Sequence, residues 1–459
     1  MRVLHLGNVA NNGYINAKLL RRAGVEADAL ADEWHILSRP EWEDAALDGA
    51  GDPWQDLAEA AARSGWRRPD WLLTFSRWDP NYSGEPWLAE RMRLAASVPR
   101  IQALHRRLRR DYAAVAEAQG TGPLRLADVA RAWVWAERLG RHFGPLARLF
   151  REYDLVQAYA IHPILPTLLT PERPFVAFEH GTMREIPFED SWYGRLLALA
   201  YRRAATVLIT NPDVVPQARR LGVERYVFVP HPIDETKYRP GPSDLRERLE
   251  AEGADFVLLS PSRHDWAIKG SDRMLRAFAE LVRNERPRAV LVLNDWGTEV
   301  ERSRALIREL GVEESVRWLQ PLPKLRLIDA YRAADVVLDQ FLIGTFGAVA
   351  PEAMACGRPV VMAFDAAHHE WCFPVLPPVV DARTPEDIHG ALAALANDPA
   401  ERERLGQAGR AWIEAHHSSR VVVESQLEVY ENVLQTPRAS AGTGAKLSGR
   451  ERVADGDGA

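Results

Sequence analysis

The chain has 459 residues, of which 46% are apolar and 27% are charged, and it is long enough for two domains that each bury a core. Its formal net charge of -6 excludes a general nucleic-acid-binding protein, because affinity for a phosphate backbone comes largely from lysine and arginine. The two cysteines, Cys356 and Cys372, lie in no CxxC or Cys/His pattern, which argues against a disulfide scaffold or thiolate metal site and favours a reducing cytoplasm.

The N-terminal residues predict the start of a parallel α/β sheet. The apolar run RVLHLGN (2–8) is followed by a helical segment and by a second candidate strand, VEADAL (25–30). The first run is too short for a signal peptide, and no stretch approaches the ~18 consecutive apolar residues of a membrane span. We therefore expect that any membrane contact is peripheral.

Residues 34–150 interrupt this alternation and are interpreted as a helical insertion rich in tryptophan and arginine. Its aromatic side chains could line an acceptor pocket, but packing is the more common use of large aromatic residues. Several arginines gather on one predicted helix, which could lie on the anionic inner face of a membrane. The alternative is a solvated basic face offset by nearby acids. These arginines are Arg100, Arg106, Arg107, Arg109 and Arg110.

The alternation of strands and helices resumes after the insertion and completes a first Rossmann-like domain, residues 1–235. Its predicted strands lie in DLVQAYA (154–160), PFVAFEHGT (174–182), TVLITN (206–211) and YVFVPHP (226–232). Residues 230–242 are rich in proline and glycine and lack periodicity, as expected of a linker between domains.

A second and more regular Rossmann-like domain is predicted for residues 236–417. Its strands lie in FVLLSPSR (256–263), AVLVLND (289–295), SVRWLQP (315–321), VVLDQF (336–341) and PVVMAF (359–364). Residues 418–436 predict a terminal helix, because Val423, Leu427, Tyr430 and Leu434 share one face that must pack on another part of the chain. The remaining residues, 437–459, contain no aromatic residue and are predicted to be disordered.

The first of two chemically distinctive loops follows a strand of the second domain. Ligands of doubly wound sheets bind outside the carboxyl ends of the strands. There, Arg263 follows the strand, and Lys269 precedes Ser271 and Asp272, two candidate helix caps. Since a helix N-terminus disfavours a nearby cation, two cations at this place suggest an anion between them. The alternative is that both side chains are simply solvated.

The second loop precedes a predicted helix of the same domain. Gly344 and Gly347 would permit close approach of a ligand to the backbone, and the amides of Ala348 and Val349 at the helix start could bind a diphosphate. Glu352 could accept both ribose hydroxyls of a nucleotide through its two oxygens. The alternative is that it only complements the helix dipole.

These two loops resemble the donor site of the family-4 retaining glycosyltransferases of GT-B fold, also called glycosyl transferases group 1. The resemblance rests on SRHDWAIKG (262–270) and EAMACGRPVV (352–361). It covers residues 255–365 closely and both domains in overall pattern. It implies an α/β protein of two Rossmann-like domains facing across a cleft, with the last helix returning to the first domain.

The resemblance also implies a function. The chain would be a retaining glycosyltransferase that moves a sugar from a nucleotide diphosphate sugar to an unidentified glycan, lipid-linked or small-molecule acceptor. Because the strand ends carry no DxD-like segment and His368 and His369 have no evident third ligand, we expect a reaction without a metal, and no cofactor is expected. Arg263 and Lys269 would bind the donor phosphates and stabilise the leaving diphosphate, and Glu352 would hold the ribose. A nucleotide-sugar epimerase, a phosphorylase and a non-catalytic sugar-binding or scaffold protein stay open as alternatives.

One position departs from the family pattern. The family's first glutamate, eight residues before Glu352, is replaced by Gly344. Asp339 and Gln340, which are polar residues near the same strand end, could compensate for its contact with the donor sugar. The alternative is an ordinary polar strand terminus.

Three residues of the first domain complete the predicted site. By resemblance, His180 positions or polarises the transferred sugar, although a single histidine is more often structural. The loop GNVANNG (7–13) takes the place of the family's glycine-rich loop. In it Gly13 could admit the diphosphate to the backbone, and the amide of Asn12 could bind donor or acceptor.

Overall fold

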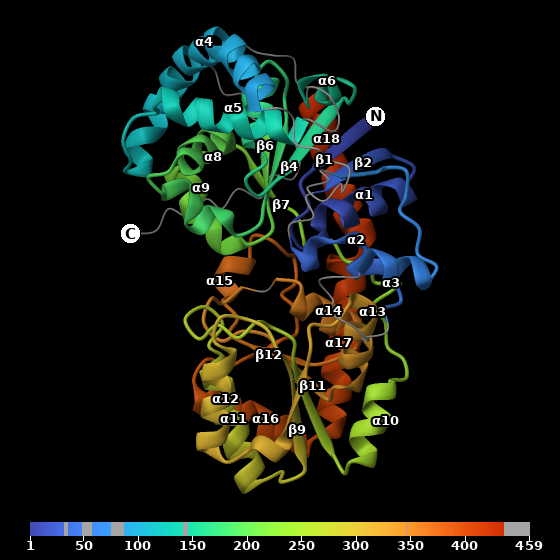
Figure 1. Cartoon of the computed structure of the whole chain (residues 1–459). Helices are drawn as coiled ribbons and strands as arrows, with labels where there is room; N and C mark the ends of the chain where they lie inside the picture. Colours follow the sequence, from blue (N-terminus) through green and yellow to red (C-terminus); the bar gives the residue numbers. More distant parts are fainter. Residues whose placement is uncertain (32–34, 48–56, 75–86, 141–145, 346, 436–459) are drawn as a thin grey trace. The chain divides into compact units, whose positions relative to one another are not determined.

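The structure is a computed structural model that describes residues 1–31, 35–47, 57–74, 87–140, 146–345 and 347–435 (Figure 1). The predicted disordered tail lies outside these residues. The chain divides into two compact units. The first comprises the described residues within Met1–Pro40, Arg68–Pro230 and Val423–Thr443, and the second those within Glu41–Arg67 and His231–Val422.

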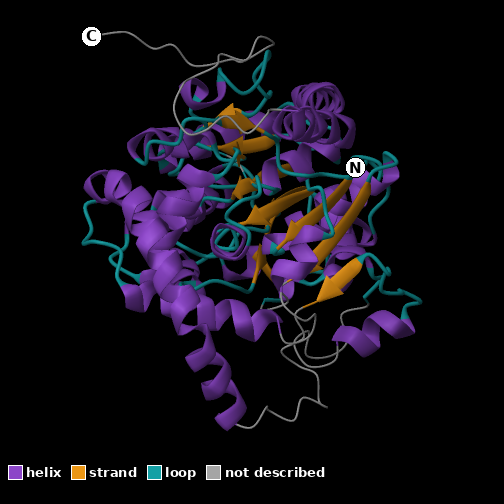
Figure 2. Ribbon diagram, turned by 90° about the horizontal axis from the view of Figure 1, so that it is seen from above, coloured by secondary structure: helices purple, strands orange, loops and turns teal. Residues whose placement is uncertain are grey.

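The first unit is built on a seven-stranded sheet in which all neighbours pair in parallel. The strand order is β3-β2-β1-β4-β5-β6-β7. Its central strands are mostly apolar and are buried on both faces, as expected of a parallel sheet covered by helices. Figure 2 shows the strands as arrows among the helices. The strands are β1 (Arg2–Leu6), β2 (Glu26–Ala31), β3 (Leu72–Thr74), β4 (Leu155–Tyr159), β5 (Val176–Glu179), β6 (Thr206–Ile209) and β7 (Tyr226–Phe228).

Among the helices of the first unit, the one around Leu196 begins at a residue of the expected chemistry. Ser191 precedes this helix, and its Oγ accepts a hydrogen bond from the Gly194 amide at 3.0 Å. The helices are α1 (Asn12–Arg22), α4 (Trp87–Gln119), α5 (Leu126–Gly140), α6 (Leu146–Arg151), α7 (Ile164–Leu169), α8 (Trp192–Arg203) and α9 (Val215–Arg220). Short helical turns are η1 (Val9–Asn11), η2 (Ile36–Ser38), η3 (Thr182–Arg184), η4 (Ile186–Phe188) and η5 (Pro212–Val214).

The terminal helix α18 (Ser419–Gln435) contributes its residues from Val423 onward to the first unit. It is held by a buried polar network as well as by apolar contacts. Tyr430 Oη donates to Gln157 Oε1 of β4 at 2.7 Å, and Gln426 Nε2 donates to Asn16 Oδ1 of α1 at 3.0 Å. Leu434, which was predicted on the packed face, is 41% exposed, so the packed face ends at Tyr430.

The second unit contains a six-stranded parallel sheet of order β10-β9-β8-β11-β12-β13. Its core joins the strands to helices on both sides through residues such as Leu258, Phe278 and Leu392. The strands are β8 (Phe256–Ser260), β9 (Ala289–Asn294), β10 (Val316–Leu319), β11 (Val336–Leu338), β12 (Val360–Met362) and β13 (Val380–Asp381). The helices are α2 (Pro40–Asp44), α3 (Leu57–Arg63), α10 (Asp244–Ala251), α11 (Ser271–Asn284), α12 (Val300–Leu310), α13 (Lys324–Ala333), α14 (Val349–Ala355), α15 (Ala366–His369), α16 (Pro385–Asn397) and α17 (Pro399–His416), with the turn η6 (Glu313–Ser315).

The described residues within Glu41–Arg67 belong to the second unit, although the sequence pattern placed them in the first domain. The reason is an ion pair with the predicted linker: Lys237 Nζ lies 2.6 Å from Glu43 Oε1 and 3.4 Å from Asp44 Oδ1. Burial opposes the charge on Lys237, but the two carboxylates outweigh it and raise its pKa. These partners are 194 and 193 residues away along the chain, so no local pattern reveals them.

Each sheet reverses its order of strand addition once, between β1 and β4 in the first unit and between β8 and β11 in the second. The loops at the carboxyl ends of these strands are where doubly wound sheets bind ligands. The two predicted Rossmann-like domains are therefore confirmed, with β3 as an edge strand too short to be seen in the sequence. The cleft between them stays a prediction.

Candidate functional site

The carboxyl ends of β8 and β11 bring together three of the residues that carry the candidate site in the second unit. Asp339 follows β11, and its side chain is only 1% exposed. Its Oδ1 accepts a hydrogen bond from Ser262 Oγ at 3.1 Å and lies 3.9 Å from Lys269 Nζ. Its Oδ2 has no partner among the described residues. Burial raises the pKa of Asp339, and Lys269 opposes that rise.

The two predicted phosphate-binding cations each have a weak carboxylate contact. Arg263 is 45% exposed, and its Nη2 lies 3.2 Å from Asp265 Oδ2. Lys269 is 23% exposed, and among the described residues its ammonium group has only the long contact to Asp339. Helix α11 is capped by Gly270, at φ 68°, without a side-chain hydrogen bond, and not by Ser271 or Asp272 as predicted. The positive charges in this loop are therefore available to an anionic ligand.

The loop before α14 is held in shape by Gln340. The side-chain carbonyl of this buried residue accepts from the Ile343 amide at 2.8 Å, and its amide group donates to the Thr345 carbonyl. Gln340 is thus committed to the loop, which corrects the hypothesis that it replaces the missing glutamate. Gly344 has a φ of 78°, a conformation that favours glycine. The open space at Gly347, where an added Cβ would meet nothing within 4 Å, agrees with ligand approach there.

The start of α14 offers the amides of Ala348 and Val349. Ala348 is the N-cap residue and makes no side-chain capping bond. In the same first turn, the backbone amide of Ala350 favours the charged form of Asp339 and opposes the rise of its pKa.

Glu352 occupies the centre of a buried hydrogen-bonded cluster. Its Oε1 accepts from Lys324 Nζ at 2.5 Å and from Tyr238 Oη at 3.1 Å, and its Oε2 accepts from Tyr331 Oη at 2.9 Å. Burial and the charge of Glu352 raise the pKa values of Tyr238 and Tyr331 well above their usual range, so both remain donors. The protein thus already occupies part of each carboxylate oxygen, and the contact of Glu352 with a ribose stays a prediction.

The corresponding loop of the first unit is built from asparagines. Asn8 donates to Asn11 Oδ1 at 2.9 Å, and Asn11 donates to the Arg39 carbonyl at 2.9 Å. These bonds hold Ala10 and Asn11 at positive φ values of 47° and 60°. Asn12 is 7% exposed, and its Oδ1 has no partner among the described residues.

Gly13 packs closely against the first loop, and its contact with a diphosphate stays a prediction. A Cβ at this position would lie 2.2 Å from the carbonyl oxygen of Gly7. The space that glycine leaves is filled by the chain itself. Glycine is required at residue 13 for packing of α1 against the first loop.

Glu179 and His180 lie together at the end of β5. His180 is half-buried, and its ring centroid lies 5.3 Å from that of Phe178. Glu179 is fully buried, and its Oε1 accepts from the Met183 amide at 3.0 Å, while Oε2 has no partner among the described residues. Burial raises the pKa of Glu179 to about 7. The sequence signal for this residue is a carboxylate at the end of an otherwise apolar strand.

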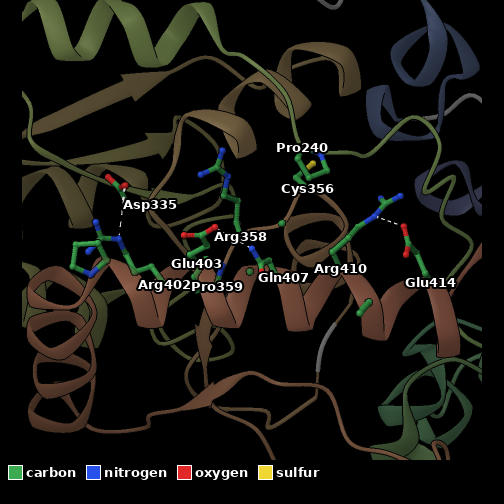
Figure 3. Close-up of a pocket in the computed structure, with 14 residues that line it drawn as sticks. Pro240, Asp335, Cys356, Arg358, Pro359, Arg402, Glu403, Gln407, Arg410 and Glu414 are labelled. Atoms are coloured by element: carbon green, nitrogen blue, oxygen red, sulfur yellow. Dashed lines mark hydrogen bonds and ion pairs between the residues drawn. The ribbon is translucent and has the colours of Figure 1, made fainter.

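A pocket of about 550 Å³ lies elsewhere in the second unit, between α17 and the turn after α14. Figure 3 shows Arg402 pointing toward Asp335 and Arg410 toward Glu414. Its charged lining is balanced, and it contains no predicted site residue. The pocket therefore supports no assignment of a binding or catalytic function.

The described residues also bear on metal binding and on membrane insertion. Within the described parts of the chain, no three histidine, cysteine, aspartate or glutamate side chains form a group that could hold a metal ion. None of the helices described combines the length and the apolar character needed to cross a membrane.

Comparison with known sequences links the second unit to one family. Residues 243–412 match the model of the family described as glycosyl transferases group 1. The D-inositol 3-phosphate glycosyltransferase of Nocardia farcinica is 34% identical over 240 residues, which cover 48% of this chain and 51% of that protein. The enzyme of the same name from Acidothermus cellulolyticus is 34% identical over 257 residues, covering 52% and 56%. The chain thus spans about half the length of these curated relatives.

Comparison with solved structures covers almost the whole chain. HepE of Anabaena, solved in complex with UDP and glucose, matches with a TM-score of 0.61 and 16% identity over 94% of this chain and 100% of that chain. Sucrose-phosphate synthase of Thermosynechococcus elongatus matches with a TM-score of 0.60 and 16% identity over 94% and 99%. At this level of identity the likeness concerns the fold.

Proposed function

We propose, from the premise that residues 243–412 form a glycosyl transferases group 1 domain in a chain of GT-B fold, that this protein is a retaining glycosyltransferase. Its donor would be a nucleotide diphosphate sugar. The observation that carries the proposal is the meeting of Lys269, Asp339 and the EAMACG segment at the switch point of the second sheet. Neither the epimerase, the phosphorylase nor the scaffold alternative has support from the relatives named above.

The second unit would hold the nucleotide part of the donor. Arg263 can fork onto phosphate oxygens, and Lys269 supplies a point charge beside them. Gly347 and the amides of Ala348 and Val349 would line the same diphosphate. Both cations would then stabilise the negative charge that develops on the leaving diphosphate.

The first unit would hold the acceptor and the transferred sugar. The bond between the sugar's anomeric carbon and the phosphate oxygen breaks, and a bond from the same carbon to an acceptor oxygen forms on the same face. The acceptor's proton passes to the leaving phosphate oxygen. His180 would position the sugar, and Asn12 Oδ1, which lacks a partner among the described residues, would accept a hydrogen bond from a hydroxyl of the acceptor. This chemistry needs no metal or cofactor, which stays a prediction.

The first donors and acceptors to test follow from the relatives. UDP-glucose is the first donor, because HepE was solved with UDP-glucose. An inositol phosphate is the first acceptor, because the sequence relatives are named for that substrate. Free glycans and lipid-linked sugars complete the panel.

The test is release of nucleoside diphosphate from a panel of nucleotide sugars, with and without each acceptor and with EDTA. A glycosyltransferase releases UDP or its equivalent faster when its acceptor is present, and EDTA leaves the rate unchanged if no metal is needed. Interconversion of the sugar without release would indicate an epimerase. Inorganic phosphate as an obligatory partner would indicate a phosphorylase.

The arginine face of α4 supports a finer proposal about location, namely a cytoplasmic enzyme that touches an anionic membrane. Ile101, Leu108, Tyr112 and Val115 bury one side of this helix. The five arginines predicted from the sequence are exposed, and no ion pair is recorded for them among the described residues: Arg100, Arg106, Arg107, Arg109 and Arg110. Vesicles containing phosphatidylserine should co-sediment with the protein, and neutral vesicles should not. Equal sedimentation with both would contradict this proposal.

A further inference from the structure

A pair of tryptophans lies between the helical insertion and the sheet of the first unit. Trp135 belongs to α5, and Trp192 is the first residue of α8. Their ring centroids are 6.0 Å apart, their planes are inclined by 58°, and both side chains are partly exposed. Because the rings are inclined and not stacked, neither covers the whole face of the other.

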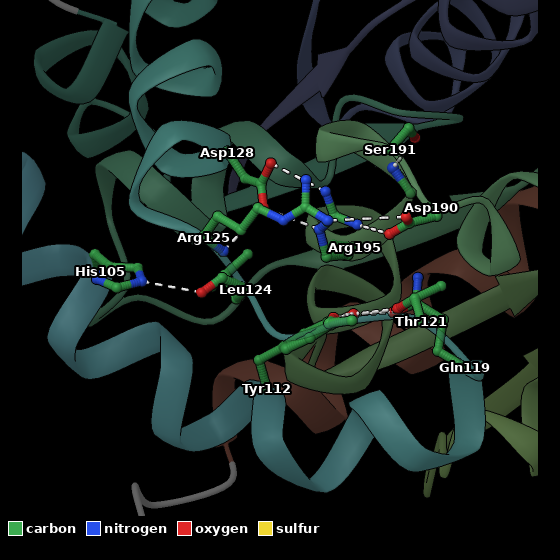
Figure 4. Close-up of polar contacts among 12 residues, drawn as sticks. His105, Tyr112, Gln119, Thr121, Leu124, Arg125, Asp128, Asp190, Ser191 and Arg195 are labelled. Carbon is green, nitrogen blue, oxygen red and sulfur yellow. Dashed lines mark hydrogen bonds and ion pairs between the residues drawn. The ribbon is translucent and has the colours of Figure 1, made fainter.

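A buried ion pair fixes this arrangement of α5 on α8 (Figure 4). Asp128 Oδ2 lies 2.9 Å from Arg195 Nε, and the two side chains are 4% and 2% exposed. Trp135 follows Asp128 by seven residues and so lies on the same face of α5. Likewise, Trp192 precedes Arg195 by three residues on α8. A buried ion pair is weak evidence for added stability but can specify one packing register, and here that register sets the two tryptophans side by side.

The tryptophan pair lies at the carboxyl edge of the first sheet. Helix α8 connects the parallel strands β5 and β6, so its first residue lies near the end of β5. The ring of His162, which follows β4, lies 5.8 Å from that of Trp135. The same histidine packs against Gly7 after β1, where an added Cβ would lie 2.5 Å from His162 Nδ1. The pair therefore adjoins the switch point between β1 and β4, which is where doubly wound sheets bind ligands.

We propose that Trp135 and Trp192 bind the ring of a cyclic polyol, a pyranose or a cyclitol, as part of the acceptor site. The carbon–hydrogen face of such a ring is apolar and lies on an indole face, while the hydroxyls at its rim reach nearby polar groups. One of these groups is the side chain of Asn12, which belongs to the same loop as Gly7. This inference rests on the proposed function, because it assumes that this edge of the sheet holds the acceptor.

The tryptophan pair favours a closed ring over an open chain or an anion. An acyclic polyol has no rigid apolar face, and it must lose torsional freedom before it can lie on an indole. A phosphate group is not attracted to the face of an aromatic ring, because that face is electron-rich. The pair should therefore distinguish myo-inositol and methyl α-glucopyranoside from sorbitol, which carries similar hydroxyl groups on an open chain.

The test is saturation-transfer difference NMR with myo-inositol, methyl α-glucopyranoside and sorbitol, which does not require the natural acceptor to be known. Wild type should transfer saturation to the ring protons of the two cyclic probes and much less to sorbitol. Trp135→Leu and Trp192→Leu should each weaken binding of the cyclic probes by about threefold to tenfold, the loss expected for one aromatic contact. Trp135→Phe keeps a smaller aromatic face and should lose less, and it serves if Trp135→Leu does not fold.

Trp71→Leu is the matched control. Trp71 is also a partly exposed tryptophan of the first unit, but its ring stacks on Tyr14 of α1 with centroids 5.3 Å apart. This variant should bind all three probes like wild type. Melting curves establish that each variant is folded. UDP, or whichever nucleoside diphosphate binds, should raise the melting temperature of every variant as it does that of wild type, because the second unit holds the nucleotide.

The outcomes separate the inference from the proposed function. If no nucleoside diphosphate stabilises the wild type, the proposed function fails, and the acceptor role of the tryptophans fails with it. If a nucleotide binds but neither cyclic probe does, only the inference is overturned. The same holds if the two leucine variants bind the cyclic probes like wild type, or if sorbitol receives as much saturation as the cyclic probes. Either result would mean that the two rings only pack the insertion against the sheet.

Discussion

Replacing Glu179 with glutamine should make the first unit more stable at alkaline pH. Glu179 is fully buried at the end of β5, and burial raises its pKa from 4.5 to about 7, against the opposing effects of the Met183 amide and Arg184. The folded chain thus holds this proton more tightly than the unfolded chain does. The contribution of Glu179 to stability is fully present below about pH 4.5 and is lost as the pH rises through about 7.

The size of this effect follows from the two pKa values. Their difference corresponds to about 3 kcal/mol in the free energy of unfolding, and a fully buried side chain needs no correction for solvent screening. Glutamine keeps the shape and the carbonyl that accepts from the Met183 amide, but it never becomes charged. At about pH 5 the variant and the wild type should therefore be similar, whereas at about pH 8.5 the variant should gain up to about 3 kcal/mol.

Calorimetric melting of both proteins across this pH range tests the prediction. Glu172→Gln is the matched control, because Glu172 is 47% exposed in a surface ion pair of the same unit. Its melting temperature should differ from wild type by a small amount that does not depend on pH. Parallel curves for wild type and Glu179→Gln would refute the reasoning, because they would mean that Glu179 stays ionised throughout.

Two further predictions concern packing. Gly344→Glu restores the family's residue but should not strengthen donor binding. It should cost about 1–2 kcal/mol, because residue 344 has positive φ and its Cβ would lie 3.0 Å from that of Asp365. Gly347→Ala is the near-neutral control for stability alone, and a stabilised, tighter-binding Gly344→Glu would contradict this prediction. The buried guanidinium of Arg195 pairs with two carboxylates, Asp128 and Asp190, as Figure 4 shows, so Asp128→Ala removes one of them and should cost about 3–5 kcal/mol in the free energy of unfolding. Asp190 is 62% exposed, and Asp190→Asn should cost under about 1 kcal/mol. Chemical unfolding that ranks these two variants the other way would contradict this prediction.

Most of the fold could be predicted because each strand is recognisable from the apolar pattern of its own short segment. Runs such as FVLLS and AVLVLN are apolar up to their last residue and are separated by helical periods, which is the pattern of a parallel sheet covered on both faces. The fold class and the two-domain organisation follow from that alternation. β3 escaped prediction because three residues do not define a period.

The candidate site was predicted only where motifs mark it. EAMACG located Glu352, and the strand-end position located Lys269 and Asp339. The partners of Glu352 come from the linker and from α13, 114 and 28 residues away, and no spacing rule connects them. The packing of Gly13 against the carbonyl oxygen of Gly7 could not be predicted for a related reason, because no sequence pattern other than the glycine itself indicates that contact.

The most direct test of the donor site is a thermal-shift titration of wild type, Arg263→Ala and Glu352→Ala with UDP, GDP, ADP, CMP and their sugar conjugates. A ligand that binds only the folded state raises the melting temperature according to its concentration over its dissociation constant. We expect one nucleoside diphosphate to stabilise the wild type, and each variant to need about ten to a hundred times more of it. Equal stabilisation of the wild type and both folded variants would contradict the assignment of the donor site.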